Sequence, residues 1–155
     1  LISMVSSNFA INLSGNERLR ITSSGNVGIN QSSPTHKLEV NGSFAATTKS
    51  FVIDHPTKEG MKLRYGSLEG PENGVYVRGR LKDNNMIELP DYWTGLVDEN
   101  TITVNLTSIG SESTLHKVVD IYDNKVVIGS EDGNINCFYT VFGERKDVEK
   151  MEVEY

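Results

Sequence analysis

The sequence predicts an all-β fold, with a short intertwined β segment followed by a compact antiparallel β-sandwich or barrel head that has at most one short helix. Three observations support this prediction. Apolar and polar residues alternate with period two along much of the chain, as in strands with one buried face. Clusters of Gly, Asn, Asp and Ser interrupt the alternation at short intervals, as turns do. Of the 155 residues, only 91–97 have the character of a helical turn.

Residues 1–43 form the first predicted segment. Of the first 50 residues, 24 are Ser, Thr, Asn or Gly, which favour turns and exposed positions. Apolar residues come in pairs separated by one residue, and Ser-Gly-Asn recurs after ten residues. Such pairs indicate short, half-buried strands. The pairs are Ile11 and Leu13, Leu19 and Ile21, Val27 and Ile29, and Leu38 and Val40.

These strands lack enough apolar surface to fold as a single copy. Each offers two inward apolar residues, whereas ordering the backbone costs about 1–2 kcal/mol per residue. Packing against identical copies would bury the apolar pairs and leave the polar positions outside, and symmetric self-association is the usual solution for soluble chains. We therefore expect a homo-oligomer. A flexible linker is the alternative, although regular apolar pairing is not typical of linkers.

Residues 44–50 are expected to be a junction, and residues 51–155 the globular head. Strands are predicted near 51–53, 62–68, 74–81, 86–89, 101–109, 117–122, 125–128 and 135–142. The last of these is apolar on both faces, which predicts a central position in its sheet. Asp123-Asn124 has the composition of a tight hairpin turn. Asp91 is placed to cap the helical turn, and residues 149–155 fit either an edge strand or a frayed end.

Charge and composition exclude several classes of partner. The net charge is −6, with +2 on residues 1–50 and −8 on the remainder. Nucleic acid is not expected as a partner, because phosphate binding needs a basic face. No apolar run approaches the roughly 20 residues that cross a bilayer, so no membrane insertion is expected.

Cys137 is the one cysteine, which excludes an internal disulfide and suggests a small buried side chain. The chain begins with Leu1, and we expect it to be a fragment of a longer protein.

One group of residues could support acid–base chemistry. Asp54, His55, Glu69 and Glu72 combine carboxylates with a histidine, as in glycosidases that use paired carboxylates. The alternative is structural, with Asp54 in a turn and the glutamates bonded to backbone donors or nearby arginines. The structural alternative is favoured, so no catalytic residue is predicted.

Neither a metal site nor a cofactor is predicted. The histidines lie far apart in the sequence without ligand spacing, and no calcium loop with a closing glutamate occurs. No glycine-rich loop opens a helix in the way that a phosphate site requires. The residues considered are His36, His55 and His116, with the acidic Asp120, Asp123, Glu131 and Asp132.

Three aromatic residues are candidates for recognition. Tyr76, Tyr92 and Trp93 could contact a sugar or a protein surface, because aromatic faces suit both. The favoured alternative for Trp93 is that its ring covers the core from the helical turn.

Several stretches carry a family resemblance. Residues 17–29 read ERLRITSSGNVGI, and residues 33–42 read SPTHKLEVNG. The first resembles a repeat common in tail fibres and related virion proteins of tailed phages, especially marine cyanophages, and the second is similar to the linker that follows it. Residues 51–109 also resemble a head module of such proteins, and the runs FVIDHP, SLEGPENGVYVRG and ELPDYW carry this resemblance.

The resemblance implies a structural fibre protein of a phage particle, in which three chains intertwine as a shaft and a distal head serves host attachment without catalysis. It implies a virion location after assembly in the host cytoplasm. The implied partners are sister chains, other virion proteins, and a glycan or protein of the host surface. The self-cleaving chaperone that ends many such fibres has no match in this sequence.

Two alternatives remain open. One is a glycan-processing enzyme that uses Asp54, Glu69 and Glu72. The other is a capsid or baseplate decoration protein that binds other virion proteins.

Overall fold

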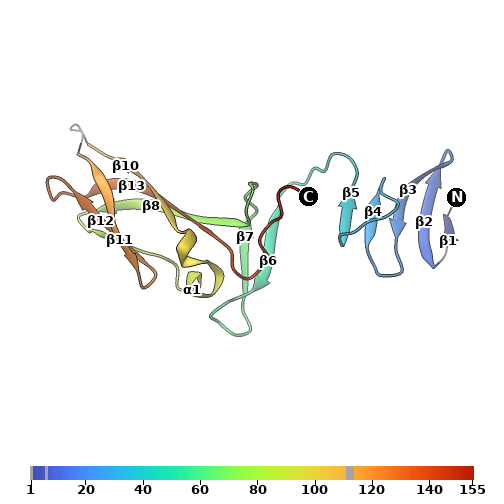
Figure 1. The fold of residues 1–155 in the computed structure, drawn as a ribbon, viewed down its shortest axis with the longest axis horizontal. Coiled ribbons are helices and arrows are strands. Elements are labelled where there is room, and N and C mark those ends of the chain that lie inside the picture. The colour runs from blue at the N-terminus through green and yellow to red at the C-terminus, as the bar shows by residue number, and fades with distance from the viewer. Residues whose placement is uncertain (1, 6, 111–113) are drawn as a thin grey trace. The chain divides into compact units, whose positions relative to one another are not determined.

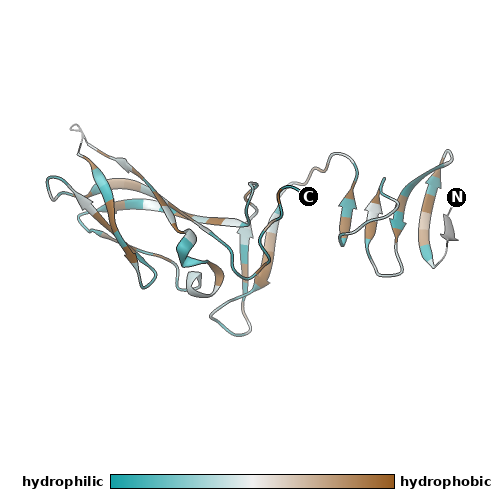
Figure 2. Ribbon diagram, viewed as in Figure 1, coloured by the Kyte–Doolittle hydropathy of each residue, from teal (hydrophilic) through white to brown (hydrophobic). Residues whose placement is uncertain are grey.

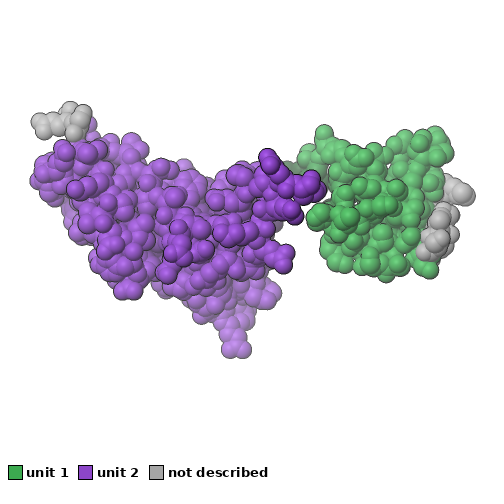
Figure 3. All heavy atoms as spheres, viewed as in Figure 1, with its two compact units in different colours: residues 1–47 green, residues 48–155 purple. Residues whose placement is uncertain are grey.

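The computed structural model describes residues 2–5, 7–110 and 114–155, and it confirms an all-β fold with one short α-helix in that part of the chain (Figure 1). The chain divides into two compact units, residues 1–47 and residues 48–155 (Figure 3). The division falls inside residues 44–50, the predicted junction. We call these parts unit 1 and unit 2.

Unit 1 is one five-stranded sheet in sequence order. Its strands are β1 (Ile2–Val5), β2 (Asn8–Leu13), β3 (Asn16–Ile21), β4 (Val27–Ile29) and β5 (Leu38–Val40). All neighbours pair antiparallel except β4 and β5, which are parallel. Ser14 and Gly15 join β2 to β3 with φ values of 51° and 78°. Two consecutive positive φ values are typical of a type I′ hairpin turn, so the first Ser-Gly-Asn run, at residues 14–16, forms a turn.

One face of the unit 1 sheet is apolar across four strands. Residues directly opposite each other in adjacent strands project from the same face, and the register aligns two apolar rows. Ile21, Ile29 and Leu38 in these rows are 40%, 42% and 54% exposed. The rows are Phe9–Ile21–Val27–Leu38 and Ile11–Leu19–Ile29–Val40, which we call the apolar face. Figure 2 shows hydrophobic residues of β2 in brown.

The opposite face of unit 1 is covered by its own loop. A side chain at Gly28 would collide with the carbonyl oxygen of Gln31 and contact Pro34, which is buried. Asn26 Nδ2 donates to the Pro34 carbonyl at 3.1 Å. The Glu39 carboxylate accepts hydrogen bonds from Thr35 N at 2.8 Å and from Gln31 Nε2 at 2.9 Å. The sheet is therefore closed on its polar face and open on its apolar face.

The loop over the polar face should respond to acid through Glu39. Hydrogen bonds to its carboxylate, first from Thr35 N and then from Gln31, lower the pKa of Glu39 from 4.5 to about 2. Because the folded pKa is lower than the unfolded one, the stabilisation is complete above pH 4.5 and is lost as pH falls toward 2. An NMR titration of the Glu39 side chain should give a midpoint near 2, and a midpoint at the ordinary glutamate value would contradict the prediction.

Unit 2 contains a two-stranded ribbon and two three-stranded sheets. The ribbon pairs β6 (Ser50–Asp54) with β7 (Lys62–Gly66). The first sheet has the order β10 (Thr103–Ser108), β13 (Asn136–Glu144), β8 (Gly74–Lys82), and the second has the order β11 (His116–Tyr122), β12 (Lys125–Ser130), β9 (Met86–Glu88). Strand β13 is central, as predicted for residues 135–142. All described pairs in unit 2 are antiparallel.

The two sheets enclose one core, to which helix α1 (Trp93–Leu96) also contributes. One sheet supplies Val75, Leu81, Cys137 and Val141, and the other supplies Ile87, Val126 and Ile128. Trp93, Leu96 and Val97 fill the space between them, and Cys137 is fully buried as expected. The predicted sandwich is therefore present, with its core shared by strands far apart in the sequence.

The Asp123-Asn124 hairpin is confirmed, since the two residues have φ values of 47° and 59°. The prediction that Asp91 caps the helical turn is wrong. Trp93 N donates to Pro90 O at 2.8 Å, so the chain turns before α1, and Tyr92 occupies the cap position without a side-chain hydrogen bond. The second short helical turn, η1 (Glu99–Thr101), is capped by the Asp98 side chain. Residues 149–155 form no strand.

Candidate functional site: an aromatic and cationic groove

The three acidic residues considered for catalysis are exposed, and two of them pair with separate lysines. Asp54 at the end of β6 pairs with Lys62, and Glu69 pairs with Lys49. Lys49 lowers the pKa of Glu69 through a hydrogen bond and its charge. A general acid needs the opposite shift. Within the described residues, no hydrogen bond or ion pair joins any two of Asp54, Glu69 and Glu72.

All three histidines have local contacts, and His36 contacts the Thr35 hydroxyl. His55 Nδ1 accepts from Thr57 N at 3.3 Å, and its ring meets the Tyr92 ring edge-on at 5.5 Å. His116 Nε2 accepts from Asn136 N at 3.2 Å. The described residues contain no group of three or more side chains that could hold a metal ion. They also contain no helix long and apolar enough to span a bilayer.

A connected aromatic cluster anchors the ribbon to the core. Tyr65 on β7 stacks on Phe51 of β6 at 5.6 Å, and its hydroxyl lies 2.9 Å from that of Tyr92. Trp93 Nε1 donates to Tyr65 Oη at 3.3 Å. Burial and the Tyr65 hydroxyl raise the pKa of Tyr92, so the Tyr92 phenol stays protonated at ordinary pH. Trp93 is only 1% exposed, which confirms the alternative that its ring covers the core.

Tyr76 and Tyr92, the other two recognition candidates, line one groove beside strand β8. Tyr76 is 43% exposed and packs against Phe142 with ring centres 5.8 Å apart. The groove also contains residues of β7, and we call it the β8 groove. Its lining includes Leu63, Arg64, Tyr65, Tyr76, Arg78 and Tyr92, and no carboxylate. The structure therefore brings two of the three candidates together and moves Trp93 into the core.

The arginines give the β8 groove a positive character. The side chains of Arg64 and Arg78 have no hydrogen-bond or ion-pair partner among the described residues. Arg78 and Arg80 alternate with core-facing Val77 and Gly79. A Cβ at Gly79 would lie 2.6 Å from the Tyr139 hydroxyl, so a larger residue there would displace the Tyr139 ring. The alternation is visible in the sequence, but the convergence of β7, β8 and Tyr92 on one groove is not.

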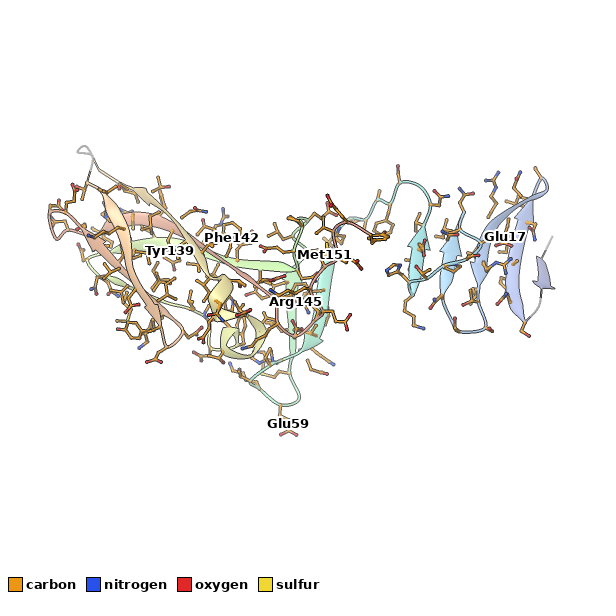
Figure 4. The ribbon with its side chains drawn as sticks, viewed as in Figure 1. Glu17, Glu59, Tyr139, Phe142, Arg145 and Met151 are labelled. Carbon is orange, nitrogen blue, oxygen red and sulfur yellow. The ribbon has the colours of Figure 1, made fainter. Side chains whose placement is uncertain are left out.

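The outer face of the first sheet continues the pattern. The register sets Tyr76 beside Phe142, Arg78 beside Thr140 and Arg80 beside Phe138. Phe138, on β13, is 53% exposed. Figure 4 labels Phe142, which is on the same strand. Aromatic rings and guanidinium groups thus share one surface of a head whose net charge is negative. Aromatic residues and arginines are enriched at the surfaces through which proteins bind partners.

The fold and the groove define a class, namely an all-β protein with a one-sheet unit and a sandwich unit that carries an aromatic and cationic groove. Comparison with known proteins adds no closer identification, because no protein-family model and no curated protein matches the sequence.

Proposed function

We propose that the chain is a structural fibre protein of a phage particle, without catalysis, in which unit 1 assembles with sister chains and unit 2 forms a head for host attachment. The observation that carries the proposal is the apolar face of unit 1. Two rows of apolar side chains cross four strands, while the opposite face is closed by the unit's own loop. Among the described side chains of unit 1, only Ala10 and Pro34 are buried.

Self-association would supply the burial of apolar surface that a single copy of unit 1 lacks. Burial of an exposed Leu or Ile side chain stabilises by about 1.5–3 kcal/mol, and the apolar face presents eight apolar residues. Identical copies can cover one another's faces around an axis, which is the common route to soluble oligomers. A trimer in a virion follows from the resemblance of residues 17–42 to phage fibre repeats. The exposure of the three carboxylates, two of which pair with separate lysines, supports a non-catalytic role.

Mass measurement tests the assembly. Sedimentation equilibrium of the unaltered chain should give three times its 17.2 kDa mass. Substituting Ile21→Asp and Leu38→Asp together should reduce the mass to one chain, because each carboxylate would be desolvated in the interface. Fluorescence of Trp93, buried in unit 2, reports whether the head remains folded.

Ser32→Asp is the matched control, because Ser32 is exposed in the loop of unit 1 and lies outside the two apolar rows. It should leave the mass unchanged. A mass of one chain for the unaltered protein at micromolar concentration would refute the proposed assembly. Locating the chain in an intact particle tests the fibre assignment against a decoration role.

A further inference from the structure

Strand β8 is a nine-residue edge strand without a described partner on its outer side. It pairs only with β13 in the order β10-β13-β8. None of the described backbone hydrogen bonds outside the sheets involves residues 74–82. An edge strand offers a row of free N–H and C=O groups, which another strand can pair with.

The β8 groove borders Tyr76, Val77 and Arg78 of this edge, and its two sides differ chemically. The core side is lined by Leu63, Tyr65 and Val77. The outer side carries Arg78, followed by Arg80 and Lys82 at alternate positions of β8. A strand that fits this edge therefore needs apolar residues facing the core and acidic residues facing outward, in strict alternation.

Residues 149–155 have that pattern. Met151, Val153 and Tyr155 alternate with Glu152 and Glu154. The three apolar side chains are 47%, 58% and 103% exposed, and the segment forms no strand. Its start is fixed where Asn73 Nδ2 donates to Glu149 O at 3.2 Å and Lys150 pairs with Glu144 at 3.0 Å. Figure 4 labels Met151 within this segment.

We propose that residues 149–155 of a second copy add to the free edge of β8 as an extra strand. Glu152 and Glu154 then lie beside the arginines of the outer face, while Met151, Val153 and Tyr155 enter the apolar side of the β8 groove. Charge complementarity selects this occupant, because the groove lining has two arginines and no carboxylate. Opposite charges in adjacent strands and burial of the apolar side chains both stabilise the added strand.

The inference deepens the proposed function, since assembly through unit 1 would raise the local concentration of the segment near neighbouring heads. The two tests fail separately. Charge reversal in residues 149–155 leaves the apolar face intact, so sedimentation mass and strand addition respond to different variants.

Hydrogen exchange on the full chain tests the proposal. Amides of β8 that point away from β13 should be protected at high protein concentration, and Glu152→Lys with Glu154→Lys should speed their exchange at least tenfold. Glu131→Lys, in an exposed turn, is the control and should have no effect on these amides. Exchange that is unaffected by the double reversal would overturn the proposal.

Mixing two variants identifies which chain donates the strand. One variant carries Glu152→Lys and Glu154→Lys, and the other carries Arg78→Glu and Arg80→Glu. Each variant alone should lack protection, and the mixture should regain it because reversed segments can meet reversed edges on other chains. Rescue only when all four substitutions share one chain would overturn the proposal in favour of the chain's own segment. Protection that requires an added sulfated polysaccharide would overturn it in favour of an anionic glycan.

Discussion

Replacing Trp93 by alanine should lower the free energy of unfolding of unit 2 by about 3–5 kcal/mol, the usual range for removing a large buried aromatic side chain. The ring is 1% exposed and lies among residues from both sheets. Its removal leaves a cavity and also strips the Tyr65 hydroxyl of a donor. Denaturant unfolding followed by far-UV circular dichroism measures the change, since the only tryptophan has been removed.

Val52→Ala is the matched control for Trp93→Ala. Val52 is on β6 of the same unit and is 51% exposed, so its truncation should change the stability by less than about 1 kcal/mol. Equal losses in the free energy of unfolding for the two substitutions would mean that Trp93 is not a central part of the core of unit 2.

Replacing Arg145 by methionine should destabilise unit 2 by about 2–4 kcal/mol, because it breaks a largely buried ion pair. Arg145 is 8% exposed and holds Asp147 through two hydrogen bonds of 2.8 and 2.7 Å. Its guanidinium also lies 4.0 Å above the Phe51 ring, which links the end of β13 to the β6–β7 ribbon. Methionine keeps the aliphatic bulk and removes the charge.

The same pair predicts a dependence on pH. The Arg145 hydrogen bonds lower the pKa of Asp147 below its ordinary 3.8. The folded pKa lies below the unfolded one, so the stabilisation is present above the ordinary value and is lost as pH falls through the folded pKa. Stability curves of the unaltered chain and Arg145→Met should therefore converge as the pH is lowered below 3.8. A constant gap between the curves down to pH 2 would contradict this assignment.

Local patterns predicted much of the fold. The hairpin at Asp123-Asn124 follows from two residues that tolerate positive φ, and the central position of β13 follows from apolar residues on both of its faces. The capping role of Asp91 failed because Pro90 starts a turn that delays the helix to Trp93. In each case the result depends on a few adjacent residues.

The candidate site was less predictable. Tyr76 and Tyr92 are recognition candidates from the sequence. Tyr65 and Arg64 line the same groove only because β7 contributes to it together with β8. Trp93 and Tyr92 are adjacent aromatic residues, and the sequence does not distinguish their positions. Only the packing of the two sheets decides that Trp93 is buried and that Tyr92 lines the groove. Contacts between distant segments carry this information.

The open apolar face of unit 1 has a consequence for how the protein is made. If sister chains cover that face, unit 1 gains its stability in a reaction whose order in chain concentration is higher than one, whereas the sandwich of unit 2 closes around its own core as a unimolecular event. In newly synthesised chains, unit 2 would then be folded before unit 1 has assembled. At low chain concentration unit 1 would stay unassembled, and at high concentration it would assemble with its sister chains.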